Sequence, residues 1–270
     1  MKCIICGSKM HYYFSKKFNS YGLSKVDYFK CGNCGFVASK THYEMSEEEW
    51  GKLNVDFHND NNLREDNPYN RNQRYFNQAL MFFLMNKIGF FKKGQFLDWG
   101  SGVGSVSKLL DTFFSIDVKN FDKFIKPQLK AMLESKLKKR SYGLVLNNAV
   151  FEHVTNRETL DNIESFVTPK GCLAIHTLVP ETIPKDSRWM YLLPVHCSFH
   201  TNKSMDILMK QWGYKCSVYN EHSKVWVLFK DDFRIVSKRA KALNKILGWD
   251  YLKFKKGFMD FWKPIKHCSK

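Results

Sequence analysis

The sequence predicts an α/β fold built on a doubly wound, mostly parallel sheet. Between residues 71 and 233, short apolar runs typical of strands alternate with amphipathic segments typical of helices, which implies parallel strands joined by helical crossovers. At the end of that stretch, the apolar runs 215–219 and 225–229 flank a polar turn, which predicts an antiparallel hairpin at the sheet edge. A cysteine-bearing unit at residues 1–40 and a basic extension at residues 234–270 lie outside this pattern.

Residues 1–40 carry two cysteine pairs, each of the form Cys-x-x-Cys and each followed by a glycine. The pairs are Cys3 with Cys6 and Cys31 with Cys34. Four thiolates at this spacing predict a zinc site, and a structural one, because four protein ligands leave no open position for catalysis. Aromatic and polar residues alternate between the pairs and predict short strands. We therefore expect a small zinc ribbon. The other cysteines are scattered, and without a secretion signal we expect thiols there rather than disulfides.

Residues 41–70 are expected to form a short helix and then a linker or lid. Ser46 and Glu49 have the spacing of a capping box, which starts a helix through Leu53. Residues 54–70 are rich in asparagine and aspartate, a composition that favours a linker or a lid.

The elements of residues 71–233 follow in a regular order. Apolar residues at helical spacing predict a helix at 71–87, which leads into a strand at 95–99 and a helix from Ser105. A second strand is expected within 114–121 and a basic helix at 126–140. The apolar run 142–147 predicts a central strand covered on both faces. A capping box at Thr155 and Glu158 opens the next helix, and a turn at 169–171 leads into a strand at 172–177. Thr201 caps a last helix that Gly213 closes.

A glycine-rich loop joins the first strand of this region to its helix. It runs from Asp98 to Gly104, with glycines at 100, 102 and 104. Glycines at this spacing let backbone N–H groups approach a ligand closely at the start of a helix. The dinucleotide-binding pattern G-x-G-x-x-G would need the third glycine one residue later, so the loop indicates a different ligand.

Three passages in order carry a resemblance to a known family. They are the D-x-G-x-G-x-G loop, the passage Asn147–Val154 with its Glu-His-Val, and His196–Ser204, of the form H-x-x-F-x-T-x-x-S. Together they resemble class I S-adenosylmethionine-dependent methyltransferases over residues 71–230. The second and third passages are similar to those of small-molecule and sugar methyltransferases. The resemblance implies the fold expected above and S-adenosylmethionine as cofactor.

The resemblance also implies roles for the residues around the glycine loop. Gly100, Gly102 and Gly104 would admit the methionine part of the cofactor, and Asp98 would bind its ammonium group directly or through water. An acid at the end of the second strand would hold the ribose hydroxyls. Asp117 and Asp122 are both candidates, and Asp122 is preferred because it ends the apolar step 118–121 and lies 18 residues after Gly104.

The carboxyl end of the central strand lies beneath the expected methyl-transfer centre. Asn147 and Asn148 end that strand, and Glu152 could hold a substrate hydroxyl or a backbone N–H group. His153 is either a general base that takes a proton from a hydroxyl nucleophile or a histidine that only packs. His196 and His200 are expected to order the loop before their helix. The family usually has a further strand and an acidic adenine contact after Asp122, and no counterpart of that acid is evident here.

The charge balance allows several partners. The net charge of +17 invites a nucleic-acid partner, although lysine far outnumbers arginine, which reads phosphates and bases better. Basic and aromatic residues interleave at 234–270, where they could meet RNA, an anionic bilayer surface or a phosphorylated carrier. The favoured alternative is a helical extension that docks on its own domain with its lysines in water. No apolar run is long enough to span a bilayer, and the N-terminus has no signal-peptide core, so a cytoplasmic protein is expected.

These observations give three functional hypotheses. The first is methyl transfer to a sugar or another polar small molecule, because a zinc ribbon before a class I domain resembles the layout of sugar C- and O-methyltransferases of polysaccharide and antibiotic pathways. The second is an RNA methyltransferase that docks RNA with its zinc ribbon and basic tail. The third is a non-catalytic binding module on the same fold.

Overall fold

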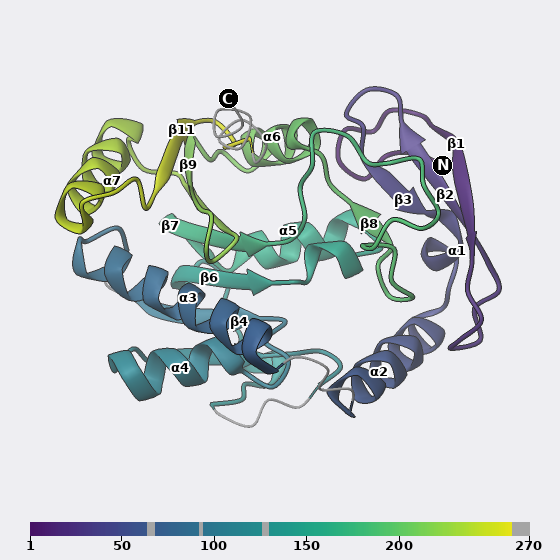
Figure 1. The fold of residues 1–270 in the computed structure, drawn as a ribbon, viewed down its shortest axis with the longest axis horizontal. Coiled ribbons are helices and arrows are strands. Elements are labelled where there is room, and N and C mark those ends of the chain that lie inside the picture. Colours follow the sequence, from purple (N-terminus) through teal and green to yellow (C-terminus); the bar gives the residue numbers. More distant parts are fainter. Residues whose placement is uncertain (64–67, 92–93, 126–129, 261–270) are drawn as a thin grey trace.

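The structure is a computed structural model that describes residues 1–63, 68–91, 94–125 and 130–260. It contains two sheets (Figure 1). The N-terminal sheet has the order β1-β2-β3-β8, and the central sheet has the order β11-β9-β10-β7-β6-β4-β5. The strands are β1 (Met10–Lys17), β2 (Lys25–Cys31), β3 (Val37–Ser39), β4 (Gln95–Trp99), β5 (Val118–Phe121), β6 (Tyr142–Asn148), β7 (Val167–His176), β8 (Ser198–Phe199), β9 (Cys216–Asn220), β10 (Val225–Phe229) and β11 (Lys253–Lys256).

Helices cover both faces of the central sheet. The α-helices are α1 (Lys40–Tyr43), α2 (Glu47–Leu63), α3 (Pro68–Lys87), α4 (Ser105–Phe114), α5 (Arg157–Ser165), α6 (Asn202–Gln211) and α7 (Phe233–Leu247), and the 3-10 helices are η1 (Glu134–Lys136) and η2 (Phe151–His153). Alternate residues of β6 serve the two faces: Leu144 and Leu146 pack with α3, α4 and α7, whereas Val145 packs with α5 and α6. Among the described residues, no helix has both the length and the apolarity needed to span a bilayer.

The predicted α/β fold with a mostly parallel sheet is confirmed. Strands β5, β4, β6 and β7 pair in parallel, and β10, β9 and β11 then pair antiparallel in turn. Strands β4, β5, β6, β7 and β9 therefore run in one direction, and β10 and β11 run in the opposite direction. The strands β9 and β10 form the expected hairpin. The carboxyl ends of β4, β5 and β6 meet at the edge of the sheet that faces the N-terminal sheet (Figure 1).

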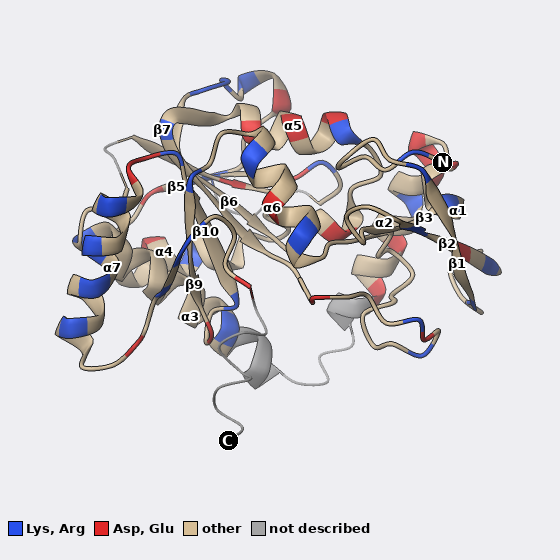
Figure 2. Cartoon of the chain, turned by 90° about the horizontal axis from the view of Figure 1, so that it is seen from above, with Lys and Arg blue, Asp and Glu red and all other residues tan. Residues whose placement is uncertain are grey.

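Residues 233–256 pack against the central sheet. Val236, Ala240 and Leu243 of α7 are buried, and β11 pairs with β9 to extend the sheet. Asp232 caps the start of α7, and Gly248, at a φ of +75°, ends it. The lysines and arginines of α7 lie on its outer surface (Figure 2). The expectations for the aromatic and basic residues at 261–270 fall outside the described residues.

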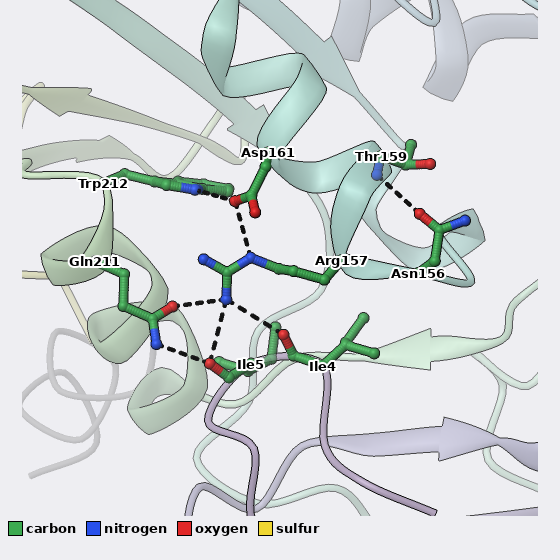
Figure 3. Close-up of polar contacts among 8 residues, drawn as sticks. All are labelled: Ile4, Ile5, Asn156, Arg157, Thr159, Asp161, Gln211 and Trp212. Carbon is green, nitrogen blue, oxygen red and sulfur yellow. Dashed lines mark hydrogen bonds and ion pairs between the residues drawn. The ribbon is translucent and has the colours of Figure 1, made fainter.

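The N-terminal unit is joined to the central domain by a shared strand. Strand β8, which precedes α6, pairs antiparallel with β3, with Val37 opposite Phe199 and Ala38 opposite Ser198. Arg157 at the start of α5 also donates to the carbonyls of Ile4 (3.3 Å) and Ile5 (3.4 Å), between the first two cysteines. The same guanidinium reaches Gln211 of α6 at 2.8 Å (Figure 3).

The second cysteine pair is held in the same manner. The Thr201 hydroxyl, at the start of α6, donates to the Cys34 carbonyl at 2.6 Å, and the Lys203 ammonium donates to the Asn33 carbonyl. Both cysteine turns are therefore fixed by the helices that cover one face of the central sheet.

Several expected elements differ from the structure. The linker or lid expected from residue 54 is helical through Leu63, because α2 continues there; residues 64–67 are outside the described residues. The helix expected at 126–140 is wrong for residues 130–140, which contain only η1 and one bridge between Ala131 and Asn120 of β5. A helix needs an apolar face to pack, and Leu133 in this segment is 70% exposed. The helix cap expected at Thr155 is Asn156, whose side chain accepts from the Thr159 N–H at 2.8 Å.

Candidate active site

The glycine loop joins β4 to α4 in a conformation that glycine alone adopts readily. Gly100, Gly102 and Gly104 have φ values of +75°, +54° and +80°. A Cβ atom at Gly100 would lie 2.4 Å from Cγ2 of Val150, whereas one at Gly102 would meet nothing within 4 Å. The first glycine is therefore required by packing, and the second borders an open space that a side chain would fill.

That space belongs to a cavity of about 670 Å³ at the carboxyl ends of the strands. The glycine loop forms one wall, and α2 contributes Trp50, Asn54, Phe57 and His58 to another. Arg74 and Tyr75 of α3 also line it. The residues of α2 and α3 were not predicted as site residues, because nothing in their local sequence shows that these helices close over the sheet edge.

Asp98 lies at the base of this cavity. Its side chain is 2% exposed, and its Oδ1 atom has no hydrogen-bond partner among the described residues. Burial, with a smaller contribution from the negative charge of Asp122, raises the pKa of the Asp98 carboxyl to about 7. A cationic ligand group next to Asp98 would relieve this penalty.

Asp122 follows β5 and faces the glycine loop. Its Oδ2 accepts from the Gly102 N–H at 2.8 Å, and its Oδ1 accepts from the N–H groups of Phe124 (2.9 Å) and Ile125 (2.8 Å). Asp117 precedes β5, is ion-paired with Lys119 and Lys130, and does not line the cavity. The structure thus brings Asp122, and not Asp117, to the glycine loop.

The two asparagines that end β6 have different surroundings. The Asn147 side chain is buried and donates to the Trp99 carbonyl at 3.1 Å, so it ties β6 to the end of β4. Asn148 lines the cavity and accepts from Gln78 at 3.3 Å. Ala149 then takes a φ of +56°, an uncommon conformation for a residue with a side chain.

A polar cluster also lines the cavity; we define it as Glu152, His153, Tyr191 and His196. The Tyr191 hydroxyl donates to Oε1 of Glu152 at 2.6 Å, while Oε2 of Glu152 is buried without a partner among the described residues. The rings of His153 and His196 lie 5.0 Å apart between centroids. Tyr191 was not predicted, because it sits in a loop without periodic pattern.

Hydrogen bonds fix the tautomers of both histidines. The Asn54 amide nitrogen donates to the Trp50 carbonyl at 2.8 Å, so its oxygen faces His153 and accepts from Nδ1 at 3.2 Å. Nδ1 of His196 donates to the Tyr191 carbonyl at 2.8 Å. Each Nε2 atom therefore keeps its lone pair. Burial lowers the pKa of His196 to about 4, and burial together with the neighbouring His196 lowers that of His153 well below its usual range.

His200 lies apart from this cluster. Its ring packs between Phe36 and Phe151, at centroid distances of 5.0 and 5.6 Å, and it does not line the cavity. It thus contributes to the packing between the N-terminal unit and η2.

The four N-terminal cysteines converge on one point. Their sulfur atoms all lie within 4.8 Å of one another, with Cys3 and Cys34 at 3.6 Å and Cys6 and Cys31 at 3.5 Å. The N–H groups of Gly7 and Gly35 donate to the carbonyls of Cys3 and Cys31, and both glycines have positive φ. Such an arrangement of thiols fits a tetrahedral metal site.

A family profile and several solved structures are similar to this chain. A family profile described as a methyltransferase domain matches residues 69–218, more than half of the chain. No curated protein sequence matches this chain significantly. Similar solved structures include a possible histamine N-methyltransferase from Thermotoga maritima, with 12% identity, coverage of 67% of this chain and 100% of that one, and a TM-score of 0.44. The plantazolicin methyltransferase BamL is also similar, with 13% identity, coverage of 71% of this chain and 94% of that one, and a TM-score of 0.47.

The family match covers the glycine loop, the polar cluster and the strands that carry them. It supports S-adenosylmethionine as the methyl donor, and it favours an enzyme over a non-catalytic binding module. The chain therefore belongs to the methyltransferase-domain family and is a methyltransferase enzyme.

Proposed function

We propose that this enzyme transfers a methyl group from S-adenosylmethionine to a hydroxyl group of a sugar or another polar small molecule. The observation that carries the proposal is the single cavity that joins the glycine loop to the polar cluster. One end offers a glycine cradle with a buried acid, and the other offers two imidazoles and a carboxyl group. A donor and an acceptor can therefore be held in the same enclosed space, which is the main requirement of methyl transfer.

The residues of the first end fit the methyl donor. Asp98 offers an unpartnered carboxyl oxygen to an ammonium group, and Gly102 leaves open space beside it. Asp122 lines the cavity next to the loop, where the remaining lone pair of its Oδ2 atom can accept from a ribose hydroxyl. When bound, S-adenosylmethionine supplies an electrophilic methyl group on a sulfonium, which needs little activation by the protein.

The polar cluster fits an acceptor that carries hydroxyl groups. The Nε2 atoms of His153 and His196 and the Oε2 atom of Glu152 can all accept hydrogen bonds, so a hydroxyl entering the cluster has acceptors around it. His153 would take the proton of the nucleophile, since its Nδ1 is already engaged with Asn54 and its Nε2 keeps a lone pair.

We also propose that the N-terminal unit is a zinc ribbon. The four converging sulfurs and the two positive-φ glycines support a zinc ion held by Cys3, Cys6, Cys31 and Cys34. Its role is structural, because it would fix the two turns that dock on α5 and α6.

The RNA hypothesis remains an alternative, supported by the net charge of +17. Its weakness is the position of the basic surface. The basic helix α7 lies at the end of the molecule opposite the N-terminal sheet (Figures 1 and 2). The cavity, in contrast, lies beside that sheet, with α2 as one wall.

Two measurements test the proposed function. Calorimetry with S-adenosylhomocysteine should show binding that Asp98→Asn weakens; no binding to the wild-type protein would refute the site. Incubation with isotope-labelled S-adenosylmethionine and a cell extract should then place label in small saccharides or other polar metabolites. Label in RNA, with binding that falls steeply as salt rises, would instead support the alternative. His153→Ala should abolish most turnover, and unchanged turnover would remove its role as a base.

A further inference from the structure

The polar cluster has the composition of a metal site as well as of an acceptor site. Among the described residues, Glu152, His153 and His196 each offer one ligating atom, and these atoms lie within 4.8 Å of one another. A carboxylate with two imidazoles suits divalent ions such as Zn²⁺, Fe²⁺, Co²⁺ or Ni²⁺. The three residues come from η2 and from the loop before β8, so the fold brings together groups that are far apart in sequence.

The surroundings of the cluster orient its side chains as ligands. In metal sites, a ligating histidine donates its other ring N–H to an oxygen, which fixes the tautomer and the ring orientation. His153 donates from Nδ1 to the Asn54 amide oxygen, and His196 donates from Nδ1 to the Tyr191 carbonyl. Both Nε2 atoms are thereby left as ligating atoms. The Tyr191 hydroxyl holds Glu152 from the side of Oε1.

A second, independent observation points to a bound cation. Glu152 is 2% exposed, yet its Oε2 atom has no hydrogen-bond partner among the described residues. A buried, unsatisfied carboxyl oxygen costs several kcal/mol, so native structures rarely keep one without a ligand. The neighbouring imidazole nitrogens bear lone pairs and cannot donate to it. A cation between the three groups would satisfy all of them at once.

We propose that a divalent transition-metal ion binds between Glu152, His153 and His196 and holds the hydroxyl oxygen of the methyl acceptor in an open coordination position. This inference rests on the proposed function for the identity of the acceptor, but not for the presence of the ion. Coordination lowers the pKa of the hydroxyl, so its proton passes to water. The oxygen then forms a C–O bond as the C–S bond of the donor breaks. The Nε2 atom of His153 is then a metal ligand and is not available as a base, so the metal takes over the activating role proposed above for His153.

Metal binding can be measured without activity. We would load the cysteine site of the full-length protein with Zn²⁺, titrate with Co²⁺, and record visible absorption and heat. Wild-type protein should bind one Co²⁺ beyond the zinc held by cysteines, without the intense thiolate-to-cobalt charge-transfer bands that a cysteine site would give. Glu152→Gln and His196→Ala should each weaken this binding at least about tenfold. His222→Ala is the matched control and should bind cobalt as wild type does, because His222 is exposed and contacts the Trp249 ring edge-on, outside the cluster.

Retained binding of S-adenosylhomocysteine shows that each variant is folded. The absence of an additional cobalt ion, or wild-type cobalt affinity in both cluster variants, would overturn the metal site. A chelator-treated enzyme that keeps its zinc, still methylates its acceptor and depends on His153 would also overturn it while leaving the proposed function intact. Activity lost on chelation and restored by the divalent ion would support it. Cobalt binding without transfer of label to any extract component would count against the proposed function alone.

Discussion

Replacing Asp98 by asparagine should stabilise the cofactor-free protein at alkaline pH and weaken cofactor binding. Burial raises the pKa of this carboxyl from 3.8 to about 7. Each unit is worth 1.36 kcal/mol, so the ionised form is disfavoured in the folded state by about 4 kcal/mol. Asparagine keeps the shape of the side chain and removes the charge.

The pH dependence identifies the cause. Because the folded-state pKa lies above the unfolded value, the folded protein binds more protons between pH 3.8 and about 7, and its stability falls as pH rises through that window. The penalty is roughly 1.5 kcal/mol at pH 5 and roughly 4 kcal/mol at pH 8. The free energy of unfolding of Asp98→Asn, relative to wild type, should therefore rise by roughly 2.5 kcal/mol from pH 5 to pH 8.

Urea unfolding at several pH values measures this difference, and the other titrating groups cancel between the two proteins. Calorimetry at pH 8 should show S-adenosylhomocysteine binding weakened about tenfold to a hundredfold, as expected for a lost charged hydrogen bond worth about 1.5–3 kcal/mol. Stability and binding thus change in opposite directions. A difference in unfolding free energy that stays flat from pH 5 to pH 8 would refute the buried-acid argument.

Three further predictions follow from the geometry. Gly100→Ala should lower the free energy of unfolding by about 2 kcal/mol or more, because its Cβ meets a packed side chain. Gly102→Ala should lower it by only about 1–2 kcal/mol and should mainly abolish cofactor binding. Thermal unfolding measures the loss of stability, and calorimetry measures the loss of binding. Cys31→Ser should abolish the proposed zinc binding and lower the melting temperature. Cys172→Ser, at a buried thiol outside the four-cysteine cluster, should bind as much zinc as wild type by elemental analysis. Tyr191→Phe should lower the free energy of unfolding by about 1–3 kcal/mol in the wild-type background and by less in a Glu152→Gln background. A double-mutant cycle measures this coupling, and its absence would contradict the hydrogen bond between the two side chains.

The elements that the sequence predicts well are those with strong local signals. The strand before Asp98, the glycine loop and the capped helix at Thr201 each combine an apolar period with a turn or cap residue, and all three are present. Local signals are weaker where two neighbouring residues could both act as the helix cap. Thr155 and Asn156 are both good caps, and only the backbone conformation selects Asn156.

Tertiary packing decides the elements that the sequence does not predict. Asparagine and aspartate disfavour helix interiors, yet α2 continues past residue 54 because its face with Leu53 and Phe57 packs against the N-terminal sheet. The same packing brings Asn54 to His153 across 99 positions of sequence. Tyr191 reaches Glu152 from a loop without hydrophobic period, so its place in the cluster depends on the fold as a whole.

The docking of the cysteine turns limits how far this enzyme can be truncated. Arg157 begins α5 shortly after His153, and β8 begins shortly after His196, so these two anchors of the N-terminal unit adjoin the polar cluster. A fragment that starts at the matched domain would leave β8 with an open strand edge and the Arg157 guanidinium without its carbonyl acceptors. The catalytic domain is therefore not a portable module. Any chimera or minimal enzyme built from it must carry residues 1–40 along.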